Sequence, residues 1–217
     1  MIRVVIWNEF YHERKDKAVM KQYPHGIHEQ LAQSLRQSPN LTIQCAWMDQ
    51  PENGLPASIL NSTDVLVWWS HLKNDAVDDS VADRIVQRIQ AGMGAIFLHS
   101  SHLSKPFKRI LGTSGDHPWR NKGEVEKIWN ISPHHPITKG LPPMFELPKE
   151  EMYGEPFDVP PPQEFVCLSG FKDGSVFRSG LTWHRGQGRV FYFRPGHESY
   201  PTYHNPYILQ ILANDIS

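Results

Sequence analysis

Four short, almost wholly apolar runs recur in the first half of the chain, and each predicts a buried β-strand. They cover residues 2–7, 41–48, 64–69 and 94–98, and valine, isoleucine and aromatic residues dominate them. Short continuous apolar runs are typical of parallel strands that are covered on both faces. The pattern therefore predicts a sheet core rather than a helical bundle.

Helical patterns separate these runs. After a polar stretch at residues 8–23, which we expect to be a loop, Ile27, Leu31 and Leu35 follow one another at intervals of four and predict one amphipathic helix. A second apolar stripe predicts a helix from about residue 78 to Gly92. Weaker patterns predict a short helix over 107–111 and a closing helix over 206–216.

The alternation of strands and helices predicts the fold class. It is typical of an α/β fold with three layers, in which helices cover both faces of a doubly wound, mostly parallel sheet. We expect one such domain over residues 1–217. Ligands bind such sheets beyond the carboxyl ends of the strands, so the loops after Trp7, Trp69 and Leu98 are the places to look for a site.

The second half of the chain is less regular. Residues 112–162 are rich in proline, histidine, tryptophan and glutamate and show no clear period. We interpret this stretch as a Pro-rich β insertion that rims the site. Strand-like runs follow at 165–168, 176–183 and 190–193, and the glycines at 186 and 188 predict a hairpin turn between the last two.

Composition and charge exclude several classes of protein. The 22 lysines and arginines balance 23 aspartates and glutamates, so no basic field favours nucleic acid. No apolar run approaches the roughly 20 residues of a membrane span, and the first residues resemble a strand rather than a signal peptide. The two cysteines form no disulfide framework. We therefore expect a cytoplasmic protein without nucleic-acid or membrane partners.

Histidines are the strongest chemical signal. His71, His99, His102 and the pair His197-Glu198 follow predicted strands directly, and His12 lies in the loop after the first strand. If these strands are parallel, their ends meet at one edge and the imidazoles form either a metal site or an acid–base cluster. No HExxH motif is present, so the metal would be held by residues that are distant in sequence.

Other side chains are candidates for substrate contacts and proton transfer. Trp69 and Tyr153, with Trp119 and Trp183, are candidate walls that stack on a sugar ring, although a place in the core suits Trp183 better. Glu151, in a cluster of glutamates, is a candidate ligand or general base. The tryptophans and prolines of residues 119–162 also suit a contact between two copies of the chain, so a homo-oligomer stays open.

Several segments together resemble one known family. They are residues 7–10 (WNEF), 67–71 (VWWSH), 98–102 (LHSSH), 135–142 (HPITKGLP), 150–153 (EEMY) and 188–198 (GRVFYFRPGHE). Over essentially the whole chain these segments are similar to the trehalose-utilisation (ThuA-like) proteins. The resemblance implies the fold of the class I glutamine amidotransferases, which is flavodoxin-like, and a role in sugar catabolism.

The same resemblance points to one difference from true amidotransferases. In those enzymes a cysteine nucleophile follows a strand, whereas this chain has His99 there, and His197-Glu198 resembles their late histidine partner. Imidazole cannot form the thioester, so we expect no glutamine hydrolysis. Two histidines at this point, completed by a nearby carboxylate or by His12, would instead form a three-ligand divalent-metal centre, most simply zinc.

We therefore expect a metal-assisted enzyme of carbohydrate catabolism that acts on a sugar or keto-sugar. His99, His197 and Glu151 are the predicted catalytic residues. The predicted substrate contacts are His71, His102, Trp69, Tyr153 and Glu198. Hydrolysis, elimination and isomerisation all stay open, and so do two alternatives: a non-catalytic ligand-binding or interaction module of the same fold, and a serine hydrolase that uses Ser100 with His197.

Overall fold

The parallel half of the sheet contains five strands. The computed structural model describes all residues 1–217, and its nine-stranded sheet begins in the order β2-β1-β3-β4-β9. Each neighbouring pair among these five strands is parallel, which is the strand order of flavodoxin-like sheets. The strands are β1 (Ile2–Asn8), β2 (Leu41–Trp47), β3 (Val65–Trp69), β4 (Gly94–Leu98) and β9 (Gly188–Phe193).

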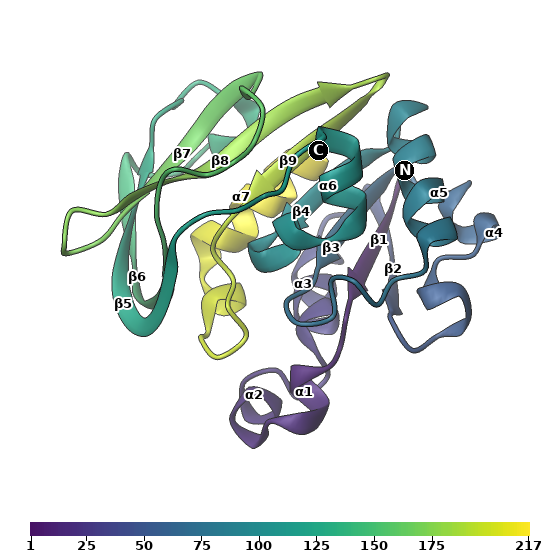
Figure 1. Ribbon diagram of the computed structural model, residues 1–217, viewed down its shortest axis with the longest axis horizontal. Coiled ribbons are helices and arrows are strands. Elements are labelled where there is room, and N and C mark those ends of the chain that lie inside the picture. Colours follow the sequence, from purple (N-terminus) through teal and green to yellow (C-terminus); the bar gives the residue numbers. More distant parts are fainter.

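The other half of the sheet is antiparallel. From β9 the order continues β8-β7-β5-β6, and every pair is antiparallel. Figure 1 shows these strands, in teal and green, extending the sheet to one side of the helical layers. The whole sheet is therefore mixed rather than mostly parallel. The strands are β5 (Trp119–Asn130), β6 (Met144–Tyr153), β7 (Glu164–Gly170) and β8 (Val176–Arg185).

Helices cover both faces of the parallel half, as the sequence predicted. Helices α3 (Ile27–Leu35) and α7 (Pro206–Ile216) pack in one apolar core, and α5 (Asp79–Gln90) and α6 (Lys105–Leu111) pack in the other. The strands are buried on both sides because alternate residues join the two cores. The short elements are α4 (Ala57–Leu60), η1 (Pro51–Gly54), η2 (His99–Leu103), η3 (Pro136–Thr138) and η4 (Thr202–His204).

The loop predicted over residues 8–23 is wrong. Two short helices, α1 (His12–Lys15) and α2 (Lys17–Gln22), occupy most of it, and they project beyond the carboxyl end of β1 (Figure 1). The Asp16 carboxylate accepts the backbone N–H groups of Ala18 and Val19 and so caps α2. These helices bury little apolar surface, which is why no hydrophobic period marked them.

Residues 112–162 contain two of the longest strands, β5 and β6. Their pairing shifts register between Arg120 and Glu124 and again between Glu124 and Glu126. A bulge breaks the alternation of apolar and polar positions, and the buried Glu126 and Glu150 stand where an apolar residue is expected. The stretch therefore extends the main sheet, although its sequence lacks a readable strand pattern.

The helices of the structure are short. None of them is long and apolar enough to cross a membrane.

Candidate functional site

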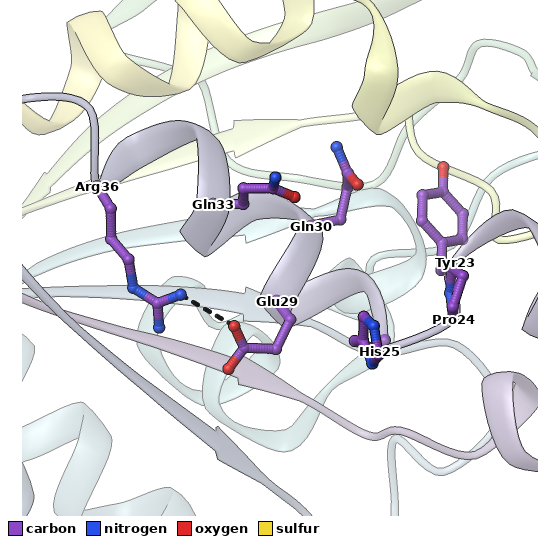
Figure 2. Close-up of a pocket in the computed structure, with 8 residues that line it drawn as sticks. Tyr23, Pro24, His25, Glu29, Gln30, Gln33 and Arg36 are labelled. Atoms are coloured by element: carbon purple, nitrogen blue, oxygen red, sulfur yellow. Dashed lines mark hydrogen bonds and ion pairs between the residues drawn. The ribbon is translucent and has the colours of Figure 1, made fainter.

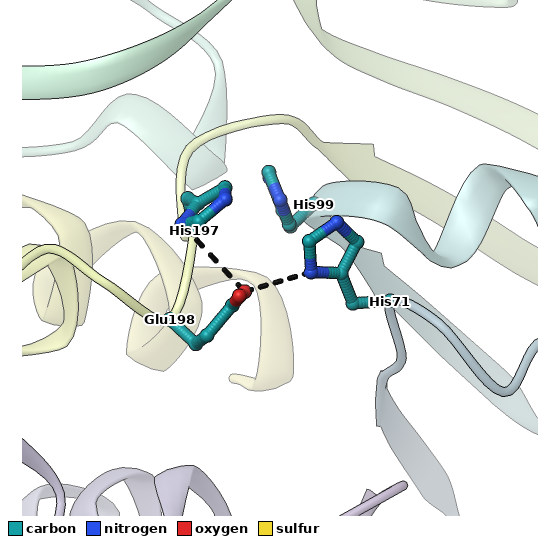
Figure 3. Close-up of side chains that lie close together, drawn as sticks. All are labelled: His71, His99, His197 and Glu198. Atoms are coloured by element: carbon teal, nitrogen blue, oxygen red, sulfur yellow. Dashed lines mark hydrogen bonds and ion pairs between the residues drawn. The ribbon is translucent and has the colours of Figure 1, made fainter. Parts of the chain in front are cut away.

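Three strand ends of the parallel half bring four side chains together. His71 follows β3, His99 follows β4, and His197 and Glu198 follow β9. One ring nitrogen of each histidine and one carboxylate oxygen of Glu198 all lie within 4.8 Å of one another, and Figure 3 shows the rings turned toward a common space. The convergence expected from parallel topology is therefore present. We call these four residues the histidine cluster.

His99 occupies a sharp turn between β4 and η2. Its φ of 54° lies in the left-handed region, which a residue with a side chain adopts at a cost of about 1–3 kcal/mol when the surroundings enforce it. Its Nδ1 donates to the Arg194 carbonyl at 3.3 Å. The other ring nitrogen, Nε2, therefore carries the lone pair, and it lies 3.4 Å from a carboxylate oxygen of Glu151.

A buried carboxylate positions the loop that carries His71. Glu9, at the end of β1, accepts the backbone N–H groups of His71, Leu72 and Lys73 at 2.7, 3.1 and 2.9 Å. Charge-assisted hydrogen bonds of this kind are stronger than neutral ones. Glu9 therefore fixes the direction in which the chain leaves β3, and with it the place of the His71 ring.

Glu198 joins two histidines. Its carboxylate accepts a hydrogen bond from His71 Nδ1 at 2.9 Å and lies 3.5 Å from His12 Nδ1. Burial raises the pKa of Glu198, but the His71 hydrogen bond and the charges of His71 and His197 outweigh burial and bring the pKa to about 2. Glu198 is therefore an anion at neutral pH.

The backbone before His197 fits only glycine. Gly196 has a φ of 141°, and a Cβ atom there would collide with the Tyr203 hydroxyl. Glu150 accepts the backbone N–H groups of Gly196 and His197 at 2.7 and 3.3 Å. The His197 Nε2 atom contacts the amide of Asn121 at 2.8 Å. Burial lowers the pKa of His197 to about 4, so its ring is neutral at pH 7.

A fully buried ion-pair network joins the two halves of the sheet behind the histidine cluster. The Arg194 guanidinium, on the residue after β9, donates to a carboxylate oxygen of Glu126 and to the backbone carbonyl of Glu151, and it lies 3.7 Å from Glu150. Burial lowers the pKa of Arg194 to about 9 and raises the pKa of Glu150 to about 8. This network ties β9 to β5 and β6.

Glu151 and Tyr153 close the site from β6. Burial raises the pKa of Glu151 to about 7, which suits a group that takes up and releases a proton near neutral pH. The Tyr153 ring stacks on His99, and its hydroxyl shares a 2.8 Å hydrogen bond with the hydroxyl of Ser100. Ser100 is thus paired with Tyr153 rather than with His197.

The donor set fits a divalent transition metal. Imidazole and carboxylate ligands suit zinc and its neighbours. His99 Nδ1 is anchored on a carbonyl and His71 Nδ1 on a carboxylate, which is how outer partners orient metal-binding histidines. Three buried atoms beside or within the cluster lack a hydrogen-bond partner: His99 Nε2, Glu151 Oε2 and His12 Nε2. Unpartnered buried atoms of this kind point to a missing ligand.

The remaining predicted site residues lie around the cluster. His12 stacks on His71 with a ring-centre distance of 5.2 Å. Trp69 is fully buried beneath the cluster, and its indole N–H donates to the Gly196 carbonyl. His102 is buried next to His99 and bonds to its carbonyl oxygen. Trp183 is a core residue, whereas Trp119 is 65% exposed at the start of β5.

Sequence reasoning missed several residues that shape the site. Asn121 and His117 lie in the stretch that had no readable elements, and Glu9 and Arg194 received no role. The one sequence signal that could have identified some of them was a charged residue directly after an apolar run. Arg194 follows the apolar run of β9, and Glu9 follows that of β1, and buried charges are rare unless they are paired.

Two hollows lie away from the cluster. A groove of about 360 Å³ runs along α3, and Figure 2 shows its lining of polar side chains, with Glu29 and Arg36 paired. A cavity of about 680 Å³ lies at the opposite end of the parallel strands, between β3, β4, β9 and the end of α7. Neither contains a residue of the histidine cluster.

Comparisons with known proteins agree with the fold. The family model described as ThuA, trehalose utilisation, matches residues 3–217. A protein described as ThuA-like from Bacteroides uniformis has a TM-score of 0.66 at 17% identity, and the match covers 98% of this chain and 89% of that one. A cytoplasmic protein of Salmonella typhimurium has a TM-score of 0.65 at 14% identity over 99% and 98%.

A further solved structure shares the fold at a lower TM-score. A protein of Thermoplasma acidophilum that is described as part of a GMP synthase has a TM-score of 0.56 at 15% identity over 100% of this chain and 92% of that one. No curated protein matches the chain. Identities this low support the fold alone.

Proposed function

Because the chain belongs to the ThuA, or trehalose utilisation, family, we propose that it is a metal-assisted enzyme of carbohydrate catabolism that acts on a sugar or keto-sugar. The observation that supports this proposal is the convergence of His71, His99, His197 and Glu198 at the carboxyl edge of the parallel strands. Ligands bind there in sheets of this type. Zinc is the ion that this donor set suits most simply.

We propose His99, His197 and His71 as ligands, with Glu198 as a fourth ligand or as the partner that orients His71. Ligand atoms around a tetrahedral ion with bonds of about 2.1 Å lie about 3.4 Å apart, so small side-chain rotations close the cluster onto an ion. His12 reaches the cluster through Glu198 and is an alternative third imidazole. A bound divalent ion supplies a Lewis acid that polarises a carbonyl or hydroxyl oxygen.

The chain's own groups handle orientation and the proton. Glu151 lies against His99 at the β6 wall of the site, where a carboxyl in buried surroundings can accept and return a proton. Tyr153 and Ser100 offer hydroxyl groups to the substrate from the same wall. We expect no glutamine hydrolysis, because His99 occupies the turn at which that reaction needs a cysteine thiolate.

The first experiment is elemental analysis of untagged protein, followed by thermal unfolding with and without a chelator. We expect about one equivalent of a divalent transition metal and a lower midpoint after chelation, because an ion that binds only the folded state stabilises it. His99→Ala and His197→Ala should lose the metal. His184→Ala, which removes an exposed histidine of β8, is the matched control and should keep it.

Two results would count against the proposal. Metal-free parent protein with no response to added zinc would favour a non-catalytic binding module of the same fold. Labelling of Ser100 by a fluorophosphonate probe would favour a serine hydrolase, although the Ser100 hydroxyl is bonded to Tyr153 rather than to an imidazole. If metal is bound, sugars and keto-sugars are then screened for a metal-dependent shift of the midpoint.

We propose the cytoplasm as the compartment. Two observations support it: both cysteines are free thiols, as is usual in reducing compartments, and the similar Salmonella protein is described as cytoplasmic.

A further inference from the structure

A second pair of histidines lies on the far side of Tyr153 from His99. His102 comes from η2, and His117 lies in the loop before β5. Their Nε2 atoms are 2.9 Å apart. His102 is buried and His117 half-buried. The Tyr153 ring contacts both sides, with its centre 5.4 Å from the His99 ring and 4.0 Å from the His117 ring. The pair is therefore separate from the histidine cluster.

The hydrogen-bond partners fix the tautomer of each ring. His102 Nδ1 lies 2.9 Å from the carbonyl oxygen of His99, and His117 Nδ1 lies 2.9 Å from the carbonyl oxygen of Pro118. A carbonyl oxygen only accepts, so both Nδ1 atoms carry the hydrogen. The Tyr192 hydroxyl gives its single hydrogen to the same His99 carbonyl at 3.0 Å. In the neutral rings, both Nε2 atoms therefore carry a lone pair and no hydrogen.

Two lone pairs that face each other inside the protein leave both acceptors without a donor, and a metal ion beside them satisfies both. Two nitrogens bound to one ion by bonds of about 2.05 Å, at an angle of about 90–109°, lie about 2.9–3.4 Å apart. The separation in this structure falls within that interval.

The outer contacts of the pair are those of metal-binding histidines. Ligating imidazoles usually donate their second N–H to a carbonyl or carboxylate, which holds the ring and directs the lone pair. Here both rings do so on backbone carbonyls. Phe157 and Tyr153 pack against both rings, which excludes hard, strongly hydrated ions such as magnesium and favours an ion that prefers nitrogen.

We propose that His102 and His117 form a second binding site for a borderline divalent transition metal such as Zn²⁺, with solvent completing the coordination. The site joins the end of β4 to the loop that enters β5, so an ion there also fastens that loop to the Tyr153 wall. Two protein ligands bind more weakly than three or four, so this site fills after the histidine cluster.

The test is a Zn²⁺ titration of metal-free, ¹⁵N-labelled protein, followed through the ring-nitrogen resonances of the histidines. We expect the Nε2 resonances of His102 and His117 to move together on the second equivalent. His117→Ala should weaken that step by at least about ten-fold, since the loss of even an outer partner of a ligand costs about 10- to 100-fold. His184→Ala should leave both steps unchanged.

The same titration of His197→Ala separates this site from the histidine cluster, because the His102 and His117 step should persist there even if the first step is lost. A hydrogen bound to Nε2 of either ring, with resonances that ignore Zn²⁺, would show a proton-bridged pair and overturn the proposal. A second step of unchanged affinity in His117→Ala would overturn it as well.

Discussion

The parallel half of the sheet carries its site residues just beyond the strand ends, whereas the antiparallel half carries most of them within its strands. His71, His99 and His197 reach the cluster because parallel strands finish at one edge. Glu126 and Glu150 lie within β5 and β6 and point into the protein. The parallel half thus supplies the proposed ligands, and the antiparallel half supplies buried carboxylates that hold the ligands in place.

This difference has an energetic consequence. The His99 and His197 rings, beyond the strand ends, can be removed without leaving a buried charge unpaired, because burial keeps both rings neutral. A buried charge within a strand cannot, because its partners are left uncompensated in a medium that solvates charge poorly. Substitutions in the two halves should therefore separate metal affinity from stability.

The largest effect is expected at Arg194, the link between the halves. Arg194→Met removes the only cation beside Glu126 and Glu150, both fully buried. Breaking such a network by removing one partner costs about 3–5 kcal/mol. We expect a loss of that size in the free energy of unfolding, measured by urea denaturation of metal-free protein.

Arg189→Met is the control for this prediction. Arg189 lies on β9, the strand that leads to Arg194, and its side chain is exposed, so the change in stability should stay within about 0.5 kcal/mol. Equal stability of Arg194→Met and Arg189→Met would show that the buried network does not hold the halves together.

A smaller effect is expected at Glu9, which serves the parallel half. Glu9→Gln keeps the shape but removes the charge that attracts three backbone N–H groups. We expect a loss of about 1–3 kcal/mol in stability and a fall of about 10- to 100-fold in metal affinity, because His71 loses its orientation. Urea denaturation and metal titration measure the two quantities.

Glu146→Gln is the matched control, since Glu146 is exposed on β6 and its nearest cation, Lys127, is 3.6 Å away. It should change neither quantity measurably. If Glu9→Gln lowers stability but leaves metal affinity at the parent value, His71 is not a ligand, and the carboxyl edge holds its ion through other residues.

The two halves also differ in how far the sequence predicted them. Continuous apolar runs such as 64–69 predicted the parallel strands, and the histidines in the loops after these runs predicted the convergence of His71, His99 and His197. This prediction has a physical basis, because the carboxyl ends of parallel strands all lie at one edge of the sheet. For the same reason the amino-acid sequence alone was sufficient to place these three histidines at that edge.

The antiparallel half was not predictable in the same way. In β5 a bulge near Glu124 shifts the register, and the buried Glu126 interrupts the apolar face. Both features remove the period of two on which strand prediction depends. The positions of Asn121 and His117 depend on this pairing, so no local pattern places them beside His197 and His102.

The smallest effect is expected at the opposite edge of the parallel half, where no site residue lies. Burial raises the pKa of Asp215, near the end of α7, to about 7, and the nearby Arg189 opposes the shift. An acid whose pKa is higher in the folded state destabilises the fold as pH rises from its unfolded value of about 4 toward 7. The parent protein should therefore lose stability over this range and then level off.

Asp215→Asn should flatten that profile. The two proteins should be equally stable near pH 4, and the variant should be more stable by about 1–2 kcal/mol at pH 7.5, less than full burial would give because the side chain keeps some solvent contact. Urea denaturation at a series of pH values measures the difference, with Asp75→Asn, an exposed loop position, as control. Parallel profiles for the parent and Asp215→Asn would mean that Asp215 ionises freely, so that the pH dependence of folding arises at the carboxyl edge, among the histidines.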